Sequence, residues 1–89
     1  MAWRLSKFAA RIELARKLRE RGFYVRWHAY EFLLGYRGRL IGTLFLEPSK
    51  GRATLYCKRG APLAEIERAL REALSEVAGG VKLEVKEVG

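Results

Sequence analysis

The sequence predicts an α+β domain with two helices and an antiparallel sheet of four to five strands, in the order α-β-β-β-β-α-β. Three observations predict this fold class. Apolar residues recur at helical spacing over residues 6–21 and 62–78. Residues 23–58 form short runs rich in β-branched and aromatic side chains, separated by turn residues. Residues 81–86 alternate between apolar and charged, as an edge strand does.

The first helix is predicted over residues 6–21, and Gly22 suits the position after its end, where a left-handed backbone is common. Its apolar residues are three or four apart and therefore share one face. This predicted buried stripe consists of Leu5, Phe8, Ile12 and Ala15, widened by Leu14 and Leu18. We expect it to pack against the sheet.

Cations occupy the rest of the first helix. Arg4, Lys7 and Arg11 form a second stripe, which we interpret either as a solvated face or as a set of phosphate contacts. Three further cations crowd the last turns, where they would stabilise the carboxyl end of the helix: Lys17, Arg19 and Arg21.

The first strand, over residues 23–28, alternates cleanly between two faces. Phe23, Val25 and Trp27 are predicted to be core residues. The opposite face would present an aromatic ring, a guanidinium and an imidazole in a row, which suits a ligand better than a core: Tyr24, Arg26 and His28.

The second and third strands, over residues 30–36 and 40–46, are apolar on both faces and are joined by a predicted tight turn at residues 36–39. Strands of this kind need cover on both sides, from helices or from another subunit. Because only two helices are available, we expect a homodimer or a higher homo-oligomer. Gly35 and Gly42 predict bulges or close backbone approaches.

The fourth strand, over residues 52–58, repeats the chemistry of the first. Ala53, Leu55 and Cys57 are predicted to point inward. The outward set again combines an aromatic ring with cations: Arg52, Thr54, Tyr56 and Lys58. The second helix follows, with Pro62 in its first turn and a buried stripe made of Leu63, Ile66, Leu70, Ala73, Leu74 and Val77.

Positive charge is concentrated in the first two thirds of the chain, whose formal net charge is +8. Residues 1–21 hold seven Lys or Arg and two Glu, residues 22–60 again hold seven and two, and residues 61–89 hold four and six. The positive surface is therefore expected on the first helix and the sheet, which favours a polyanionic partner.

The 89 residues are expected to form one domain, over residues 1–89. The chain contains no Asp, Asn or Gln, and this lack of thermolabile amides in a highly charged chain is typical of thermophilic proteins. The single cysteine excludes an intrachain disulfide, and no apolar run is long enough to cross a bilayer. We expect a soluble cytoplasmic protein without a membrane partner.

Catalysis is not expected. His28 and Cys57 are the only histidine and cysteine, no Asp could orient either, and the strand pattern places them on opposite faces. One His and one Cys cannot supply a zinc or iron–sulfur ligand set. We therefore predict no enzyme activity, no catalytic residue, no metal site and no cofactor.

The residues instead predict a nucleic-acid-binding domain. Lys and Arg attract phosphates, whereas exposed aromatic rings stack unpaired bases. The predicted function is sequence-nonspecific binding of single-stranded nucleic acid, with DNA favoured. An RNA-binding or ribonucleoprotein-associated module is the alternative, followed by a protein-interaction domain. The predicted interface comprises Arg4, Lys7, Arg11, Tyr24, Arg26, His28, Tyr36, Arg37, Arg39, Arg52, Tyr56, Lys58 and Arg59.

In plan and composition the chain resembles the ThermoDBP-related proteins, a family of single-stranded-DNA-binding proteins from hyperthermophilic archaea whose fold differs from the OB barrel. The resemblance is carried by the segments GFYVRWH at 22–28 and ATLYCKRG at 53–60, and by the turn that contains Arg37 and Arg39. It implies single-strand binding through arginine and aromatic side chains, and assembly into an oligomer.

The element order also resembles the α-β-β-β-α-β core of PD-(D/E)XK nucleases, with Glu13 in an early helix and Gly22-Phe23 entering the first strand. Those enzymes hold magnesium with an Asp and a Glu-x-Lys motif. Here Asp is absent, and Glu47 and Lys50 are spaced differently around a proline. The resemblance therefore implies, at most, an inactive nuclease-like domain that interacts with proteins.

Overall fold

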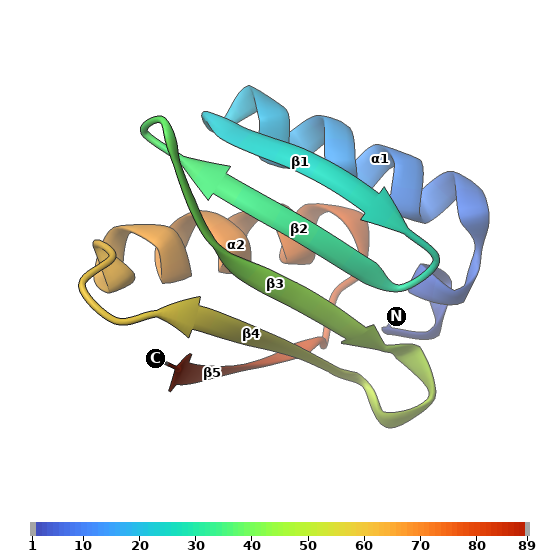
Figure 1. Cartoon of the computed structure of the whole chain (residues 1–89). Coiled ribbons are helices and arrows are strands. Elements are labelled where there is room, and N and C mark those ends of the chain that lie inside the picture. The colour runs from blue at the N-terminus through green and yellow to red at the C-terminus, as the bar shows by residue number, and fades with distance from the viewer. Residues whose placement is uncertain (1, 89) are drawn as a thin grey trace.

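The computed structural model describes residues 2–88 and contains two α-helices, two short 3-10 helices and five strands (Figure 1). The elements follow one another as η1 (Ala2–Ser6), α1 (Phe8–Glu20), β1 (Phe23–His28), β2 (Glu31–Tyr36), β3 (Arg39–Glu47), η2 (Pro48–Lys50), β4 (Arg52–Lys58), α2 (Leu63–Val77) and β5 (Lys82–Val88). The predicted order and the α+β class are confirmed.

The five strands form one sheet in the order β1-β2-β3-β4-β5. Strands β1 to β4 are antiparallel neighbours, as predicted, whereas β5 runs parallel to β4. The sheet is therefore mixed rather than wholly antiparallel. The reason is the connection: α2 crosses from the end of β4 back to the start of β5, and such a helical crossover returns the chain in the same direction.

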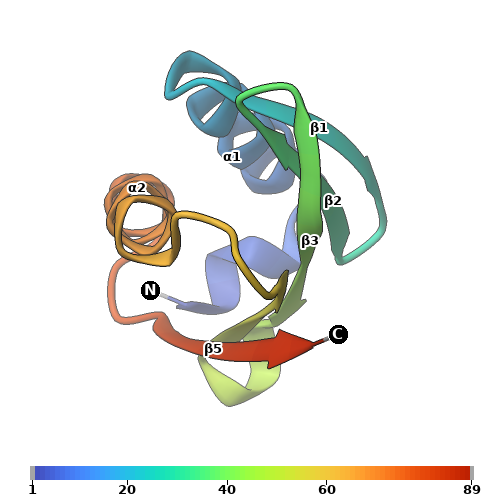
Figure 2. The same cartoon turned by 60° about the vertical axis from the view of Figure 1, so that its left-hand side comes forward.

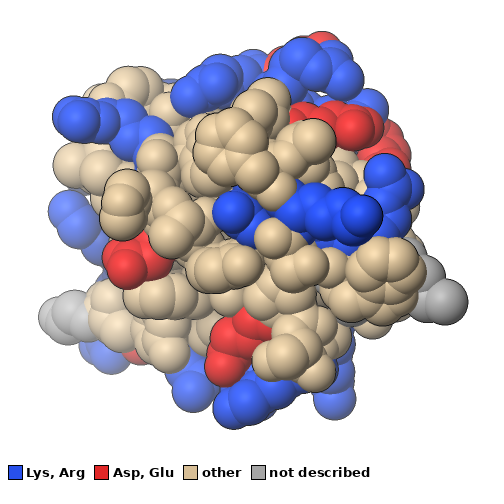
Figure 3. All heavy atoms as spheres, turned by 90° about the vertical axis from the view of Figure 1, so that its right-hand side faces the viewer, with Lys and Arg blue, Asp and Glu red and all other residues tan. Residues whose placement is uncertain are grey.

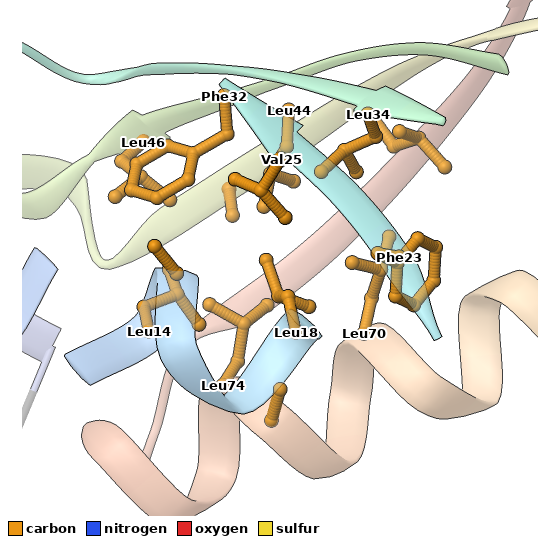
Figure 4. Packing of buried hydrophobic residues seen from close by; sticks show 14 of the residues in the cluster. Leu14, Leu18, Phe23, Val25, Phe32, Leu34, Leu44, Leu46, Leu70 and Leu74 are labelled. Carbon is orange, nitrogen blue, oxygen red and sulfur yellow. The ribbon is translucent and has the colours of Figure 1, made fainter. Parts of the chain in front are cut away.

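Both helices cover the same face of the sheet, and the sheet curves around them (Figures 1 and 2). The core lies between these two layers, where leucines of the helices meet apolar side chains of the strands (Figure 4). Completely buried members include Leu14, Leu18, Phe32, Leu34, Leu44 and Leu70. Burial of each such side chain contributes about 1.5–3 kcal/mol, so this interface supplies the main stabilisation of the fold.

The buried face of α1 differs from the predicted one. Phe8 and Ile12 are 63% and 48% exposed, so their predicted burial is wrong. The helix buries Leu14, Ala15 and Leu18, as predicted, and it also buries Ala10 and Arg11. Two alanines on this face let the helix lie close to the sheet, whereas Phe8 and Ile12 turn outward.

Arg11 fits the buried face because its guanidinium has partners there. Its Nη1 donates to the Leu5 carbonyl oxygen at 2.9 Å, and the guanidinium carbon lies 4.3 Å from the centre of the Tyr30 ring. These contacts offset part of the cost of removing the charge from water. A pattern that assigns every arginine to the solvent side therefore misplaces one edge of the buried stripe, while Leu14, Ala15 and Leu18 are buried as predicted.

The other face of the sheet is open, because no helix among residues 2–88 covers it (Figure 2). Tyr24, Arg26 and His28 of β1 are exposed, and so are Tyr56 and Lys58 of β4, as the alternation predicts. We call this surface the outer face. Neither α1 nor α2 combines the length and apolar character of a membrane-spanning helix.

Candidate nucleic-acid interface

The outer face has one row of side chains that crosses all five strands, defined by strand register. The row consists of Arg26, Leu33, Thr43, Tyr56 and Lys86. Strands β1 and β4 are thus separated by two others, and at about 4.8 Å per strand their aromatic and cationic residues lie about 14 Å apart. The two groups of predicted ligand residues share a face but do not form one cluster.

A cleft opens at the end of the sheet where β3 begins and β4 ends. It has a volume of about 730 Å³ and lies between the β2–β3 turn and the β4–α2 loop. We call it the end cleft. Its lining residues come from two segments: Tyr36, Arg37, Arg39, Leu40 and Ile41 on one side, and Lys58, Arg59, Gly60, Ala61 and Pro62 on the other.

A bulge in β3 creates this cleft. Leu34 pairs with Gly42 but Gly35 pairs with Leu40, so Ile41 is an extra residue in β3. Pairing with β4 begins only at Gly42, and residues 39–41 therefore diverge from β4 (Figure 1). Gly42 has φ 153°, and a Cβ there would lie 1.9 Å from the Tyr56 carbonyl oxygen. The predicted close approach at Gly42 is confirmed, and only glycine allows it.

Glu65 in the first turn of α2 fixes one wall of the end cleft. Its carboxylate accepts a hydrogen bond from the Tyr36 hydroxyl and, at 2.7 Å, one from Nη2 of Arg37. The hydrogen bond to Glu65 raises the pKa of Tyr36. Arg37 and Gly38 both have positive φ, as a two-residue hairpin turn of type I′ requires. Tyr36 and Arg37 thus build the wall, and their polar groups already have partners.

Three other cations around the end cleft have no such partner. Arg39, Lys58 and Arg59 make no ion pair within 4.0 Å with a carboxylate of residues 2–88. Arg39 and Lys58 are exposed, as is Arg59. Three positive charges on one cleft repel one another, and an anion placed between them would relieve that repulsion.

Comparisons with known proteins add nothing to this geometry. No protein-family model matches the chain, and neither the curated proteins nor the solved structures contain a match. The resemblance to the ThermoDBP-related proteins therefore stays a prediction.

The other predicted interface residues lie in different surroundings. Arg52 is on the outer face but is bound to Glu47 through two hydrogen bonds, Nε–Oε1 at 2.9 Å and Nη2–Oε2 at 3.2 Å. This pairing lowers the pKa of Glu47. Arg11 is buried, so we leave it out of the interface.

Arg4 and Lys7 lie in or beside η1, which packs near η2 at the end of the sheet opposite the end cleft. Figure 3 shows this end of the molecule: uncharged atoms cover much of it, with a strip of Lys and Arg atoms across the middle. Elements η1 and α1 also carry three large apolar side chains that are about half exposed or more: Trp3, Phe8 and Ile12. We call this set the α1 patch.

Sequence reasoning missed a hollow on the outer face between β3 and β5. Its volume is about 300 Å³, and its lining residues are Phe45, Glu47, Arg52, Thr54, Tyr56, Glu84 and Lys86. We call it the outer hollow. Because β3 is apolar on both faces, its sequence does not predict that Phe45 faces outward, and Glu84 and Lys86 could not be assigned to the hollow without the parallel pairing of β5.

Residues 2–88 hold no group of three His, Cys or Glu side chains that could bind a metal ion. Cys57 points into the core, as predicted, and desolvation by burial raises the pKa of its thiol. A thiol with a raised pKa is a poor nucleophile because little of it is ionised.

Proposed function

We propose that this protein binds single-stranded nucleic acid through the outer face and the end cleft. The observation that carries the proposal is the continuity of the two surfaces. Lys58 is the last outward residue of β4 and also lines the end cleft, so exposed rings and unpaired cations lie along one path. That combination is what proteins use to bind single strands, with phosphates on the cations and unpaired bases on the rings.

The path has room for several nucleotides. From Lys58 to Arg52 the strand extends about 20 Å at about 3.3 Å per residue. Tyr24, Phe45 and Tyr56 present rings at exposures of 52%, 37% and 37%. In this arrangement Arg39, Lys58 and Arg59 would hold phosphates, and the rings would stack unpaired bases. Paired bases are stacked on one another and cannot reach the rings, which disfavours duplexes. DNA is proposed over RNA on the resemblance to the ThermoDBP-related proteins alone.

Fluorescence anisotropy tests this proposal with labelled single-stranded DNA, single-stranded RNA and duplex DNA of equal length, each at two salt concentrations. We expect single strands to bind more tightly than the duplex, and the affinity to fall steeply as salt rises. A preference for structured RNA would favour the ribonucleoprotein alternative. If none of the three nucleic acids binds at low salt, the proposal is overturned and a protein partner is favoured.

Stacking can be tested separately from charge. Tyr24→Ala and Tyr56→Ala should each weaken single-strand binding by about 1–3 kcal/mol, because each removes one ring on which a base stacks. Phe8→Ala is the matched control, since Phe8 is an exposed ring on α1, and α1 covers the face of the sheet opposite to the outer face (Figure 2). Unchanged affinity in both tyrosine variants would contradict the use of the sheet for stacking.

Self-association is a further part of the proposal. The exposed apolar side chains Leu33, Leu40 and Phe45 lie on the outer face, and the α1 patch is a second exposed apolar area. Light scattering would show a mass of at least twice the 10.2 kDa of the chain if the protein assembles, and 10.2 kDa would contradict assembly. If single strands bind without dissociating the assembly, the outer face is not its interface.

A further inference from the structure

The outer hollow combines two aromatic walls with charged groups of both signs. The rings of Phe45 and Tyr56 are perpendicular, with centroids 6.1 Å apart and an interplanar angle of 89°. A flat heterocycle stacked on one of these rings would lie perpendicular to the other, which is a favourable aromatic arrangement. The Lys86 ammonium lies 5.9 Å from the centre of the Tyr56 ring and closes one side. The hollow therefore has the shape and chemistry of a site for a nucleobase.

The two carboxylates of the hollow differ in what they already bind. Glu47 holds Arg52 through two hydrogen bonds and has Lys50 at 3.6 Å. The nearest cation to Glu84 is Nη1 of Arg52, at 4.0 Å, which is too long for a hydrogen bond. The Glu84 side chain is 37% exposed. Its two oxygens are therefore available to a ligand.

An available carboxylate selects for a ligand that donates hydrogen bonds. It repels phosphates, so on a surface that binds nucleic acid it can contribute only through a base. Guanine is the one base with two adjacent donors, N1–H and the N2 amino group, on its Watson–Crick edge. These match the two oxygens of a carboxylate, while the O6 and N7 acceptors of guanine suit a cation such as Lys86.

The other bases fit less well. Thymine and uracil offer one N–H between two carbonyl oxygens, and those oxygens would be repelled by Glu84. Adenine and cytosine place a single amino group beside an unprotonated ring nitrogen, so a carboxylate can accept only one hydrogen bond from them. We propose that the outer hollow is a guanine site, with Glu84 accepting from N1–H and N2–H. This inference rests on the proposed function, because the Watson–Crick edge is free only in a single strand.

The experiment compares short single-stranded DNAs that differ at one central position, in an otherwise all-thymidine strand. We expect the strand with one guanine to bind about 5- to 150-fold more tightly than the all-thymidine strand, the range for one bidentate base contact. Replacing that guanine by hypoxanthine, which lacks the N2 amino group, should remove most of the gain.

Variants assign the preference to Glu84. Glu84→Gln should reduce the ratio of the two affinities to below about 2-fold, because an amide presents only one acceptor oxygen to the two donors. Glu87→Gln is the matched control: it makes the same change of charge in the same strand, on the side opposite to Glu84, and should leave the ratio unchanged. Lys86→Gln is a second test if Glu84→Gln fails to fold, and it should also lower the ratio.

The outcomes separate the two proposals. Equal affinity for the guanine and all-thymidine strands would overturn the guanine site and leave single-strand binding intact. A preference that survives in Glu84→Gln, or in Lys86→Gln where that is the variant that folds, would overturn it as well. If the protein binds neither strand at low salt, the proposed function itself is overturned.

Discussion

Replacing Arg39, Lys58 and Arg59 together by alanine is expected to weaken single-strand binding by about 10²–10³-fold at about 50 mM salt. For single strands the logarithm of the affinity falls by about 0.7 per phosphate contact for each tenfold rise in salt. Three lost contacts should therefore lower the slope of log affinity against log salt by about 2. Because this difference in affinity grows as salt falls, it gives the expected loss of affinity at about 50 mM salt. Titrations of the variant and the unmodified protein at several salt concentrations measure both quantities.

The control is a variant with the same loss of charge elsewhere. Arg16, Arg68 and Arg71 are exposed on the helices, away from the open face, and their joint replacement by alanine should change the salt slope by less than about 1. If single-strand affinity falls by the same factor in both triple variants, then binding depends on the net charge of the protein and the end cleft has no special part in it.

Gly42→Ala is expected to destabilise the fold by about 3–5 kcal/mol, which is a large part of the stability of a domain of this size. The added Cβ would lie 1.9 Å from the Tyr56 carbonyl oxygen and 3.0 Å from Cys57 Cα, both of them backbone atoms that cannot move aside. At about 4–8 °C per kcal/mol, the melting temperature should fall by at least about 12 °C. Thermal unfolding followed by circular dichroism measures it.

Two other glycines provide controls for this prediction. Gly79 has open space around it and no left-handed backbone, so Gly79→Ala should change stability by less than about 1 kcal/mol. Gly38 also has open space but has φ 79°, so Gly38→Ala should cost about 1–2 kcal/mol of backbone strain alone. If Gly42→Ala proved no worse than Gly38→Ala, the close approach of β3 to β4 would be contradicted.

The sequence was sufficient to predict the strands because their side chains alternate. Phe23 and Val25 are buried whereas Tyr24 and Arg26 are exposed, and the same pattern places Cys57 inside and Tyr56 outside. Alternation has a period of two, so in a strand that buries one face the sequence largely determines which residues face the core and which face solvent.

The face of α1 could not be predicted in the same way, because burial there depends on contacts with distant parts of the chain. Arg11 is buried only because the Leu5 carbonyl and the Tyr30 ring receive its guanidinium. Phe8 is exposed but still lies near Trp27, with ring centroids 5.5 Å apart. The spacing of apolar residues along the helix does not reveal these contacts with distant residues.

The two concave sites were also beyond sequence reasoning. Arg39 and Lys58 were predicted as interface residues, but the bulge that brings them to one cleft depends on the register between β2 and β3. The outer hollow depends on the parallel pairing of β5, which places Glu84 beside Thr54 and Lys86 beside Tyr56.

Nuclear magnetic resonance of nitrogen-15-labelled protein, titrated with a short single-stranded DNA, tests the central claim most directly. Single-strand binding on the outer face and in the end cleft predicts that the amide signals of residues 39–42, 54–61 and 84–86 shift, together with Tyr24. Signals from the solvent side of α2, such as Arg68 and Glu72, should stay in place. Shifts confined to α1 and α2, or no shift at millimolar DNA, would contradict the account.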